Sequence, residues 1–399
     1  MAAIPEGFKG FIATATLTKF LFNLARRLVY PFAPEFARGL HTDLSAITSL
    51  IAINQATSLL GPAGAWFADR YGYKIIMLIS ICMLAAGSFA AGFIPLYSVL
   101  GAGLFIAGLA KSIFDPSLQA FISNMVPFGQ RGKIIGITEL AWAGCTIAGI
   151  PAAGLVIQRF SWQTPFIIIG VLSLASLGVI MIIMPDDRKI PAHVHHKGRQ
   201  KEPGWETIVK NPRVVGMLSF CFCMSLANDN LFVIYGAWLE KSYNLSLAGI
   251  GFGTIFIGMA EISGETCTAF LSDRIGLKKS VLIGVSLCSM AYFILPVLDT
   301  GLYHVLAGLF IIFFTFEFTI VTSMSLSTEL VPELRASTMA AFFATAGMGR
   351  VAGAFSGGMI WAGYGIHGIC LVSGLFTLTG LACVIAGFRY KRTCSGSRN

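Results

Sequence analysis

The sequence predicts an all-α membrane protein with twelve transmembrane helices arranged in two six-helix bundles. Three observations support this fold class: twelve long apolar runs, Lys and Arg concentrated in every second loop, and an internal repeat. Of the 399 residues, 55% are hydrophobic and 12% are charged, and the mean hydropathy is +0.76. A soluble domain is far less apolar than this. Lipid must therefore surround most of the chain.

Twelve apolar runs are long enough to form spanning helices. A helix needs roughly 20 apolar residues to cross a hydrocarbon layer about 30 Å thick. The runs do not alternate as the strands of a transmembrane barrel would, so we expect helices. They lie near residues 10–34, 46–67, 75–95, 99–126, 134–157, 164–184, 214–238, 247–271, 280–297, 301–328, 338–361 and 365–388.

Basic residues gather in alternate loops and in the C-terminal tail. They are Arg70, Lys74, Arg131, Lys133, those of segment 185–213, Arg274, Lys278, Lys279, Arg335 and the tail from Arg389. The intervening loops hold only Arg38, Arg159 and Lys241. By the positive-inside rule, both termini and the 185–213 loop are cytoplasmic. The formal net charge of +9 is therefore a topology signal, and we expect no nucleic-acid partner.

A duplication divides the chain. The long polar segment 185–213 is expected to be a cytoplasmic linker between an N-terminal bundle, 1–184, and a C-terminal bundle, 214–399. An offset of 204 residues aligns Ala65, Asp69, Arg70, Gly72 and Lys74 with Ala269, Asp273, Arg274, Gly276 and Lys278. The same offset aligns Arg131 with Arg335, Gly149 with Gly353, and Gly154 with Gly358. One offset that serves three separate elements indicates a repeated six-helix unit.

The two aligned loops carry a family resemblance. Asp69-Arg70-Tyr71-Gly72-Tyr73-Lys74 resembles the signature loop of the major facilitator superfamily, Gly-x-x-x-Asp-Arg-x-Gly-Arg-Lys, and Asp273–Lys279 resembles a second copy. Ala65 and Ala269 depart from the pattern, since the family usually has Gly there. The resemblance covers essentially the whole chain. It implies a secondary transporter whose halves rock about a midplane site.

The resemblance also implies a role for these loops, because the family's acidic residue latches the two halves on the cytoplasmic side. The latch residues would be Asp69, Arg70, Gly72, Lys74, Asp273, Arg274, Gly276 and Lys278. A merely solvated, positively charged loop is the alternative. In both copies the Gly would permit a tight turn.

The fifth span contains a stretch rich in small residues, Gly144–Gly154, with Pro151 inside it. It resembles the Gly- and Pro-rich stretch of proton-driven exporters in the superfamily, although it lacks the Gly directly before Pro151 and the terminal Gly pair. Close helix packing without any exporter role is the alternative, because small residues are common at helix contacts in membranes. Pro151 is expected to bend the helix.

Charged and amide side chains within the spans are the candidate site. An ionisable group at membrane depth costs about 2.5–3.5 kcal/mol, so each one is a functional candidate. In the family's architecture, spans one, four, seven and ten line the central cavity, and in this chain all four carry charge. The candidate substrate-binding residues are Asn23, Arg26, Arg27, Tyr30, Lys111, Asp229, Asn230 and Glu317.

Spacing on the first and fourth spans refines these candidates. Asn23, Arg26 or Arg27, and Tyr30 recur at intervals of three and four, which places them on one helix face. Arg26 and Arg27 point about 100° apart, so we expect different partners for them. Lys111 and Asp115 are spaced to pair with each other, and a purely structural pair is the alternative.

Carboxylates at membrane depth are the candidate proton carriers. They are Asp115, Glu139, Glu261, Glu265 and Glu317. Glu261 and Glu265 lie four residues apart, and mutual repulsion in a low dielectric favours their protonated forms. Acids that do not carry protons would be neutralised by Arg26, Arg27, Lys111 or Arg350.

Other chemistries find little support in the sequence. No Gly-x-x-x-x-Gly-Lys-Ser/Thr phosphate loop is present, which disfavours ATP-driven transport by this chain. His193, His195 and His196 fall in the central polar loop, where a linker is a better explanation than a metal site. Eight of the nine cysteines lie in apolar runs and predict no disulfide framework. We expect no cofactor, no metal and no enzymatic activity.

Three functional hypotheses follow. The first is a proton-coupled exporter of a small organic or amphipathic solute, with an anion or zwitterion favoured by the basic first span. The second is a facilitator without coupling, or an importer that carries substrate and ion together. The third is a membrane-embedded enzyme or lipid-handling protein. We expect a monomer in the bilayer of a bacterial inner membrane, with a small-molecule substrate and protons as partners.

Overall fold

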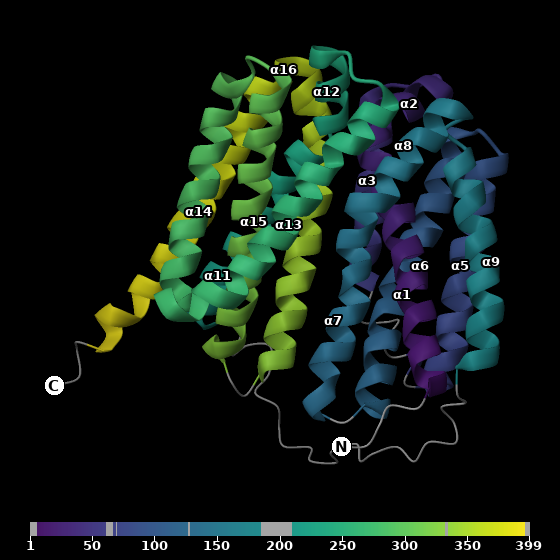
Figure 1. The fold of residues 1–399 in the computed structure, drawn as a ribbon. Coiled ribbons are helices and arrows are strands. Elements are labelled where there is room, and N and C mark those ends of the chain that lie inside the picture. The colour runs from purple at the N-terminus through teal and green to yellow at the C-terminus, as the bar shows by residue number, and fades with distance from the viewer. Residues whose placement is uncertain are drawn as a thin grey trace. The chain divides into compact units, whose positions relative to one another are not determined.

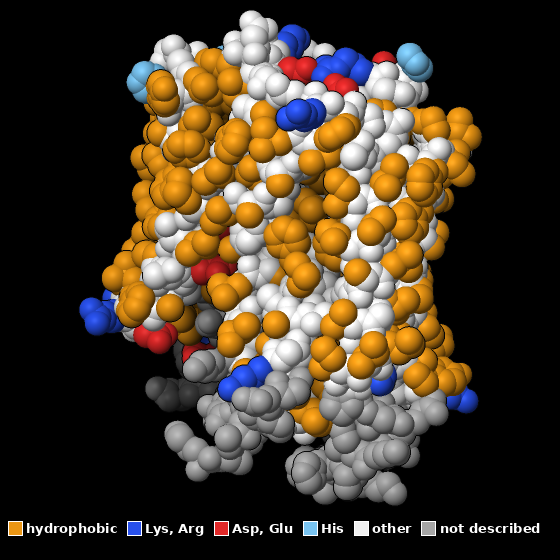
Figure 2. Space-filling view, turned by 45° about the vertical axis from the view of Figure 1, so that its right-hand side comes forward, with side chains coloured by type: hydrophobic (Ala, Val, Ile, Leu, Met, Phe, Trp, Pro, Cys, Tyr) orange, Lys and Arg blue, Asp and Glu red, His pale blue; other side chains and the backbone are white. Residues whose placement is uncertain are grey.

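A computed structural model describes residues 6–60, 67–68, 70–126, 128–184, 210–331 and 334–395. Throughout these residues the regular structure is helical, and no strand occurs among them (Figure 1). On the face shown in Figure 2, hydrophobic side chains cover much of the surface, whereas the Lys and Arg side chains lie mainly near its upper and lower edges. This distribution suits helices whose sides face lipid.

The chain divides by its internal contacts into two compact units. Unit 1 comprises residues 1–197 and Leu245–Ile255, and unit 2 comprises Gly198–Asn244 and residues 256–399. The expected bundles, 1–184 and 214–399, differ from this division mainly at Leu245–Ile255. That segment lies with unit 1 because Thr254 donates a hydrogen bond to the Thr146 carbonyl (3.1 Å) and the Ala248 amide donates one to Gln158 (2.9 Å).

Unit 1 contains the helices of the first half. They are α1 (Glu6–Arg27), α2 (Val29–Gly39), α3 (Leu44–Ala56) with a 3-10 turn (Thr57–Leu60), α5 (Tyr73–Phe93), α6 (Tyr97–Met125), α7 (Phe128–Gly144), a π-helical turn (Cys145–Gly149), α8 (Ile150–Arg159) and α9 (Thr164–Ile183). The π-helical turn directly precedes the helix that begins around Pro151, a local irregularity that the sequence did not predict.

Unit 2 contains most of the second half. Its helices are α11 (Pro212–Phe232), α12 (Tyr235–Tyr243), most of α13 (Leu247–Ile275), α14 (Leu277–Ile294) with a 3-10 turn (Leu295–Leu298), α15 (Leu302–Leu330) and α16 (Arg335–Ser395). The long α16 is two helices joined at Gly365, whose φ of 59° and ψ of −155° are not helical. This junction separates the expected eleventh and twelfth spans.

Nine helices among the described residues are long and apolar enough to cross a membrane, and one of them is the 52-residue run that contains the Gly365 junction. Leu44–Leu60 is a shorter apolar helix. The first span, α1 with α2, is less apolar because α1 carries Lys9, Lys19, Arg26 and Arg27. When the 52-residue run is counted as two spans, and the first span and Leu44–Leu60 are added, the described helices account for the twelve expected spans.

The two units share a pattern of turns and breaks. Gly72 and Gly276, 204 residues apart, both have a positive φ (97° and 92°) directly before a helix, a conformation that a side chain would strain. The first span of each half is broken, after Arg27 in one and after Phe232 in the other. Corresponding breaks in two repeats are typical of the helices that bind substrate in transporters.

Candidate functional site

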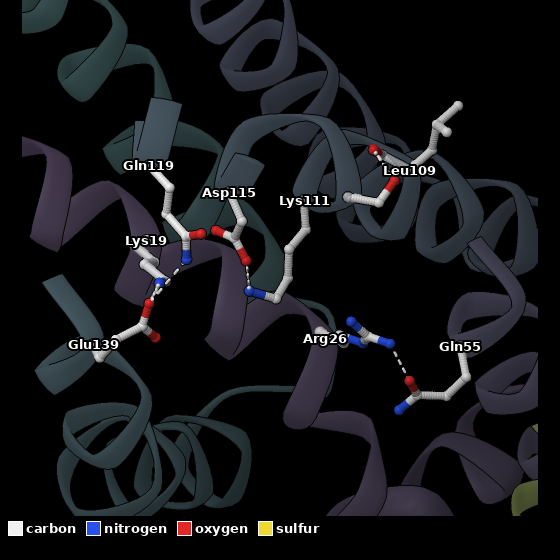
Figure 3. A network of polar contacts seen from close by, with 9 residues as sticks. Lys19, Arg26, Gln55, Leu109, Lys111, Asp115, Gln119 and Glu139 are labelled. Atoms are coloured by element: carbon white, nitrogen blue, oxygen red, sulfur yellow. Dashed lines mark hydrogen bonds and ion pairs between the residues drawn. The ribbon is translucent and has the colours of Figure 1, made fainter. Parts of the chain in front are cut away.

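A network of polar side chains lies inside unit 1, on helices α1, α3, α6 and α7 (Figure 3). Helix α6 supplies Lys111, Asp115 and Gln119, which are four residues apart and therefore share one face. In Figure 3 the Lys111–Asp115 pair lies between the Lys19–Glu139 pair and the Arg26–Gln55 pair. A charged network thus joins four helices inside unit 1.

In the Lys111–Asp115 pair, the lysine side chain is more deeply buried than the aspartate side chain. Lys111 Nζ lies 2.5 Å from Asp115 Oδ2, and the side chains are 6% and 25% exposed. The other carboxylate oxygen, Oδ1, is buried and accepts no hydrogen bond from the described residues. The sequence prediction that these two residues pair with each other is confirmed. Asp115 retains a free acceptor that a proton or a ligand could use.

Lys19 and Glu139 form the second pair, with Lys19 Nζ 2.6 Å from Glu139 Oε1. Lys19 is 4% exposed and Glu139 is 47% exposed, so the cation is buried while the carboxylate is accessible. Gln119 Nε2 donates to the same carboxylate oxygen at 3.3 Å. Gln119 therefore connects Glu139 to the α6 face that carries Lys111 and Asp115.

The adjacent arginines Arg26 and Arg27 have different surroundings, as their angular separation predicted. Arg26 donates a hydrogen bond to the Gln55 side-chain oxygen, and the Gln55 amide donates to the Tyr30 hydroxyl. The Arg27 guanidinium lies over the Trp142 ring, 4.2 Å from its centroid. Arg26 and Tyr30 therefore belong to one group through Gln55, and Arg27 belongs to another.

Asn23 lies on the same helix face as Lys19 and Arg26 and is fully buried. Neither its amide nitrogen nor its oxygen has a hydrogen-bond partner among the described residues. A buried amide without partners is destabilising, so such a group usually has a functional or solvent-linked explanation.

Unit 2 carries its polar groups on α11, α13, α15 and α16. Asp229 Oδ2 lies 4.0 Å from Arg350 Nε, and Asn230 Oδ1 accepts a hydrogen bond from Ser356 at 2.7 Å. The Asn230 amide nitrogen is buried and has no partner among the described residues. Glu317 on α15 packs closely on α13, since a Cβ on Gly264 would lie 2.9 Å from Glu317 Cβ.

Glu261 and Glu265 share a face of α13 but differ in environment, because Glu261 is buried and Glu265 is exposed. The structure therefore brings together some candidates within each unit: Arg26 with Tyr30, Lys111 with Asp115, and Asp229 with Arg350.

The signature loops are only partly described. Asp69 and the side chains of Arg131, Lys133 and Arg335 lie outside the described residues, as do His193, His195 and His196. Arg70, Asp273, Arg274 and Lys278 are exposed. Lys74 Nζ donates to the Met184 carbonyl at 2.6 Å, and Lys278 Nζ lies 4.7 Å from the centroid of Phe388. Both contacts join positions related by the offset of 204.

The sequence patterns did not predict Gln55, Gln119 and Trp142 as site residues, and they did not indicate that Lys19 pairs with Glu139. The signal for Gln55 was present, since an amide within the apolar run 46–67 is unusual. The Lys19–Glu139 pair joins residues 120 positions apart, which no local spacing could reveal. Among the described residues, no group of three or more His, Cys, Asp or Glu side chains could hold a metal ion.

Comparisons with known proteins agree with this fold. Residues 15–343 and 218–397 match the family model for the Major Facilitator Superfamily. A relative from Bacillus subtilis, the uncharacterized MFS-type transporter YceJ, is 26% identical over 77% of this chain and 78% of its own length.

Two further relatives match shorter parts. The gentisate transporter of Corynebacterium glutamicum is 27% identical over 63% of this chain and 60% of its own. The quinolone resistance protein NorA of Staphylococcus aureus is 25% identical over 59% of this chain and 62% of its own.

Solved structures show the same architecture. A bacterial homologue of the human lysosomal transporter Spinster superposes with a TM-score of 0.76 over 96% of both chains, at 13% identity. The nucleoside transporter NupG gives a TM-score of 0.74 over 95% of this chain and 99% of its own, at 17% identity. The expected fold of twelve transmembrane helices in two six-helix bundles is thereby confirmed, and the chain belongs to the major facilitator superfamily as an integral membrane transporter.

Proposed function

We propose that this chain is a proton-coupled secondary transporter that exports a small organic or amphipathic solute by alternating access. The observation that carries the proposal is the charge network of unit 1, where Lys19 and Lys111 are buried against carboxylates that remain partly accessible. Charges inside spanning helices are costly and by default mark a substrate or ion pathway.

Substrate binding is assigned to polar residues of both units. These are Asn23, Arg26, Arg27, Tyr30 and Lys111 in unit 1, and Asp229, Asn230 and Glu317 in unit 2. In unit 1 the cations outnumber the carboxylates, which favours an anionic or zwitterionic substrate. Arg26 is the best candidate for the anion, because a guanidinium binds a carboxylate through two parallel hydrogen bonds. The similarity to a transporter of gentisate, an aromatic carboxylate, supports this class.

Proton coupling is assigned to one or more of Asp115, Glu139, Glu261, Glu265 and Glu317. Glu139 is the best placed of these, because its carboxylate is about half exposed while its partner Lys19 is buried. A proton on Glu139 removes the negative charge that compensates Lys19, and an uncompensated buried cation is strongly unfavourable. Protonation would therefore favour a different arrangement of the cluster, which is what coupling requires.

Export is proposed on two grounds, the similarity to a quinolone resistance protein and the Gly-rich stretch Gly144–Gly154 in the fifth span. The two signature loops, from Asp69 to Lys74 and from Asp273 to Lys278, are assigned to the conformational latch. We further propose six-helix bundles at 1–184 and 214–399 with a cytoplasmic linker between them. The monomer would reside in a bacterial inner membrane with both termini in the cytoplasm.

Import by proton–substrate symport is the second candidate, and the charge of unit 1 favours it for anions. Protonation of Glu139 or Asp115 makes the network more positive, so an anion binds more tightly when the proton is bound. By linkage, the bound anion raises the affinity for the proton by the same factor. The proton and the anion would then cross the membrane together. A zwitterion or a cation whose positive group takes the place of the proton would instead compete with the proton, as exchange and export require.

Transport into proteoliposomes tests the proposal and separates the candidates. A panel of aromatic carboxylates, zwitterions and cationic amphiphiles would be measured with and without an imposed pH gradient. Export by exchange predicts substrate movement against the direction of proton flow, and symport predicts movement with it. Equal rates with and without the gradient for every transported solute would contradict proton coupling and favour a facilitator.

A further inference from the structure

One end of unit 2 gathers positive charge around a single aromatic ring. Helices α11 and α14 begin there, and the last turns of α16 lie beside them. Close backbone contact brings α11 and α16 together: a Cβ on Gly216 would lie 2.6 Å from the Cys383 carbonyl oxygen, and one on Gly387 would lie 2.6 Å from that of Pro212. Arg213 is therefore held next to the end of α16.

Arg213 and Lys278 both lie over the ring of Phe388. The Arg213 guanidinium carbon is 5.7 Å from the ring centroid, and Lys278 Nζ is 4.7 Å from it. Attraction to the ring holds each cation, but the two like charges repel each other. Neither forms an ion pair with a carboxylate of the described residues, and Arg213 Nε is buried without a hydrogen-bond partner among them.

Helix dipoles add to this positive field. Arg213 is the second residue of α11, and Lys278 is the second residue of α14. A helix N-terminus carries a partial positive charge that disfavours cations and favours anions. Two cations and two helix N-termini around one ring are thus electrostatically unfavourable unless an anion binds between them.

The corresponding position of unit 1 is different. Lys74, the equivalent of Lys278, donates a hydrogen bond to the carbonyl of Met184, the equivalent of Phe388. The unit 1 lysine is therefore satisfied by the protein itself. In unit 2 the same lysine faces a ring that it shares with Arg213. The equivalent of Arg213 in unit 1, Lys9, is also basic, so the two units differ in what the lysine contacts and not in the two charges.

We propose that Arg213 and Lys278 bind the phosphate of an acidic phospholipid headgroup, with Phe388 against the glycerol and upper acyl chain. A lipid is favoured over a soluble anion because the site lies where three membrane-spanning helices begin or end, which is the depth of the headgroups. Basic pockets between transmembrane helices bind anionic headgroups in this way. The site contains none of the residues proposed to bind substrate or protons, but Lys278 also belongs to the signature loop assigned to the latch.

Native mass spectrometry of the full-length protein in mild detergent would test this proposal by titration with phosphatidylglycerol or with phosphatidylcholine of the same acyl chains. Wild-type protein should bind phosphatidylglycerol at least tenfold more tightly. The double variant R213Q/K278Q should lose roughly 30-fold of that affinity, since each basic residue near an anionic headgroup contributes about fivefold. The matched control R274Q/K279Q removes two exposed charges nearby and should lose less than about threefold.

Equal losses in the two double variants, or equal binding of the two lipids by wild-type protein, would overturn the proposal. If the double variant does not fold, the single variants Arg213→Gln and Lys278→Gln carry the test, each with an expected loss of about fivefold. Glycerol 3-phosphate and inorganic phosphate serve as competitors. Displacement of phosphatidylglycerol by either below millimolar concentration would assign the site to a soluble anion and contradict a lipid site.

Discussion

Unit 1 and unit 2 follow one helical plan, but the charges within their membrane-spanning helices are mainly positive in unit 1 and mainly negative in unit 2. Unit 1 places four cations among two carboxylates, namely Lys19, Arg26, Arg27 and Lys111 with Asp115 and Glu139. Unit 2 places one cation among four carboxylates, namely Arg350 with Asp229, Glu261, Glu265 and Glu317. At the offset of 204, none of these charges falls on another charge.

Turns and close helix contacts match between the units. Gly72 and Gly276 adopt the same left-handed turn, and Gly149 and Gly353 both lie at crowded helix contacts. The repeat thus preserves turns, close packing and the charges of the signature loops, while the charges within the spans differ. The matched residues account for the shared helical plan, and the unmatched charges within the spans account for the different chemistry of the two units.

The largest expected effect is the loss of one partner from the buried pair of unit 1. Lys111→Met should lower the free energy of unfolding by about 3 kcal/mol, because Asp115 then lacks its counter-charge. Adding Asp115→Leu should restore most of the loss, since replacing both partners is close to neutral. Unfolding by dodecyl sulfate titration in mixed micelles measures this, with the exposed Lys279→Met as control. If the double variant does not regain stability, the unpaired charge of Asp115 is not the cause of the destabilisation by Lys111→Met.

A second test compares the matched glycines of the two units. A Cβ on Gly353 would lie 2.5 Å from the Leu226 carbonyl oxygen, whereas one on Gly149 would lie 2.9 Å from the tip of the Phe20 ring. A ring can turn aside but backbone cannot, so Gly353→Ala should destabilise by about 1–3 kcal/mol and Gly149→Ala by clearly less. The same titration measures both variants. A larger loss for Gly149→Ala would contradict the packing argument.

Much of this architecture could be predicted from the sequence. The apolar runs set the spans because backbone groups in lipid must be satisfied within helices, and a single offset revealed the repeat. The Lys111–Asp115 pair was predictable because it is local, four residues apart on one helix.

Long-range partners could not be predicted. The Glu139–Lys19 ion pair and the Arg26–Gln55 hydrogen bond depend on how the helices pack, which a single sequence does not specify. The π-helical turn before Pro151 and the unequal burial of Glu261 and Glu265 likewise depend on tertiary contacts. Periodicity reports which face a residue occupies, but it does not report what that face meets.

Arginine-to-lysine substitutions test which unit binds the anionic part of the substrate. If unit 1 holds the anionic part of the substrate, Arg26→Lys should weaken substrate binding by about tenfold, because lysine cannot make the two parallel hydrogen bonds of arginine. Arg350→Lys in unit 2 should change binding by less than about threefold, since that arginine already faces Asp229. Binding of the best-transported anion by isothermal titration calorimetry measures both. Equal losses of substrate affinity in the two variants would contradict the proposal that unit 1 binds the anionic part of the substrate.

The smallest expected effect concerns the lysines of the two signature loops. In zwitterionic lipid, Lys74→Gln should destabilise by about 1 kcal/mol, because it weakens a charge-assisted hydrogen bond at the end of α9. Lys278→Gln should destabilise the protein less than Lys74→Gln in zwitterionic lipid. In phosphatidylglycerol the destabilisation by Lys278→Gln should be larger. Thermal unfolding in nanodiscs of the two lipids measures this difference. An identical lipid dependence of the two variants would contradict the asymmetry between the lysines.

The most direct test of the account is gradient-driven flux after each membrane carboxylate is replaced by its amide. The five variants are Asp115→Asn, Glu139→Gln, Glu261→Gln, Glu265→Gln and Glu317→Gln, each reconstituted in proteoliposomes with an imposed pH gradient. We expect that at least one variant, with Glu139→Gln the foremost candidate, loses its response to the gradient while it still exchanges substrate between the two sides. If all five variants respond to the gradient as the wild type does, proton coupling through these carboxylates is wrong.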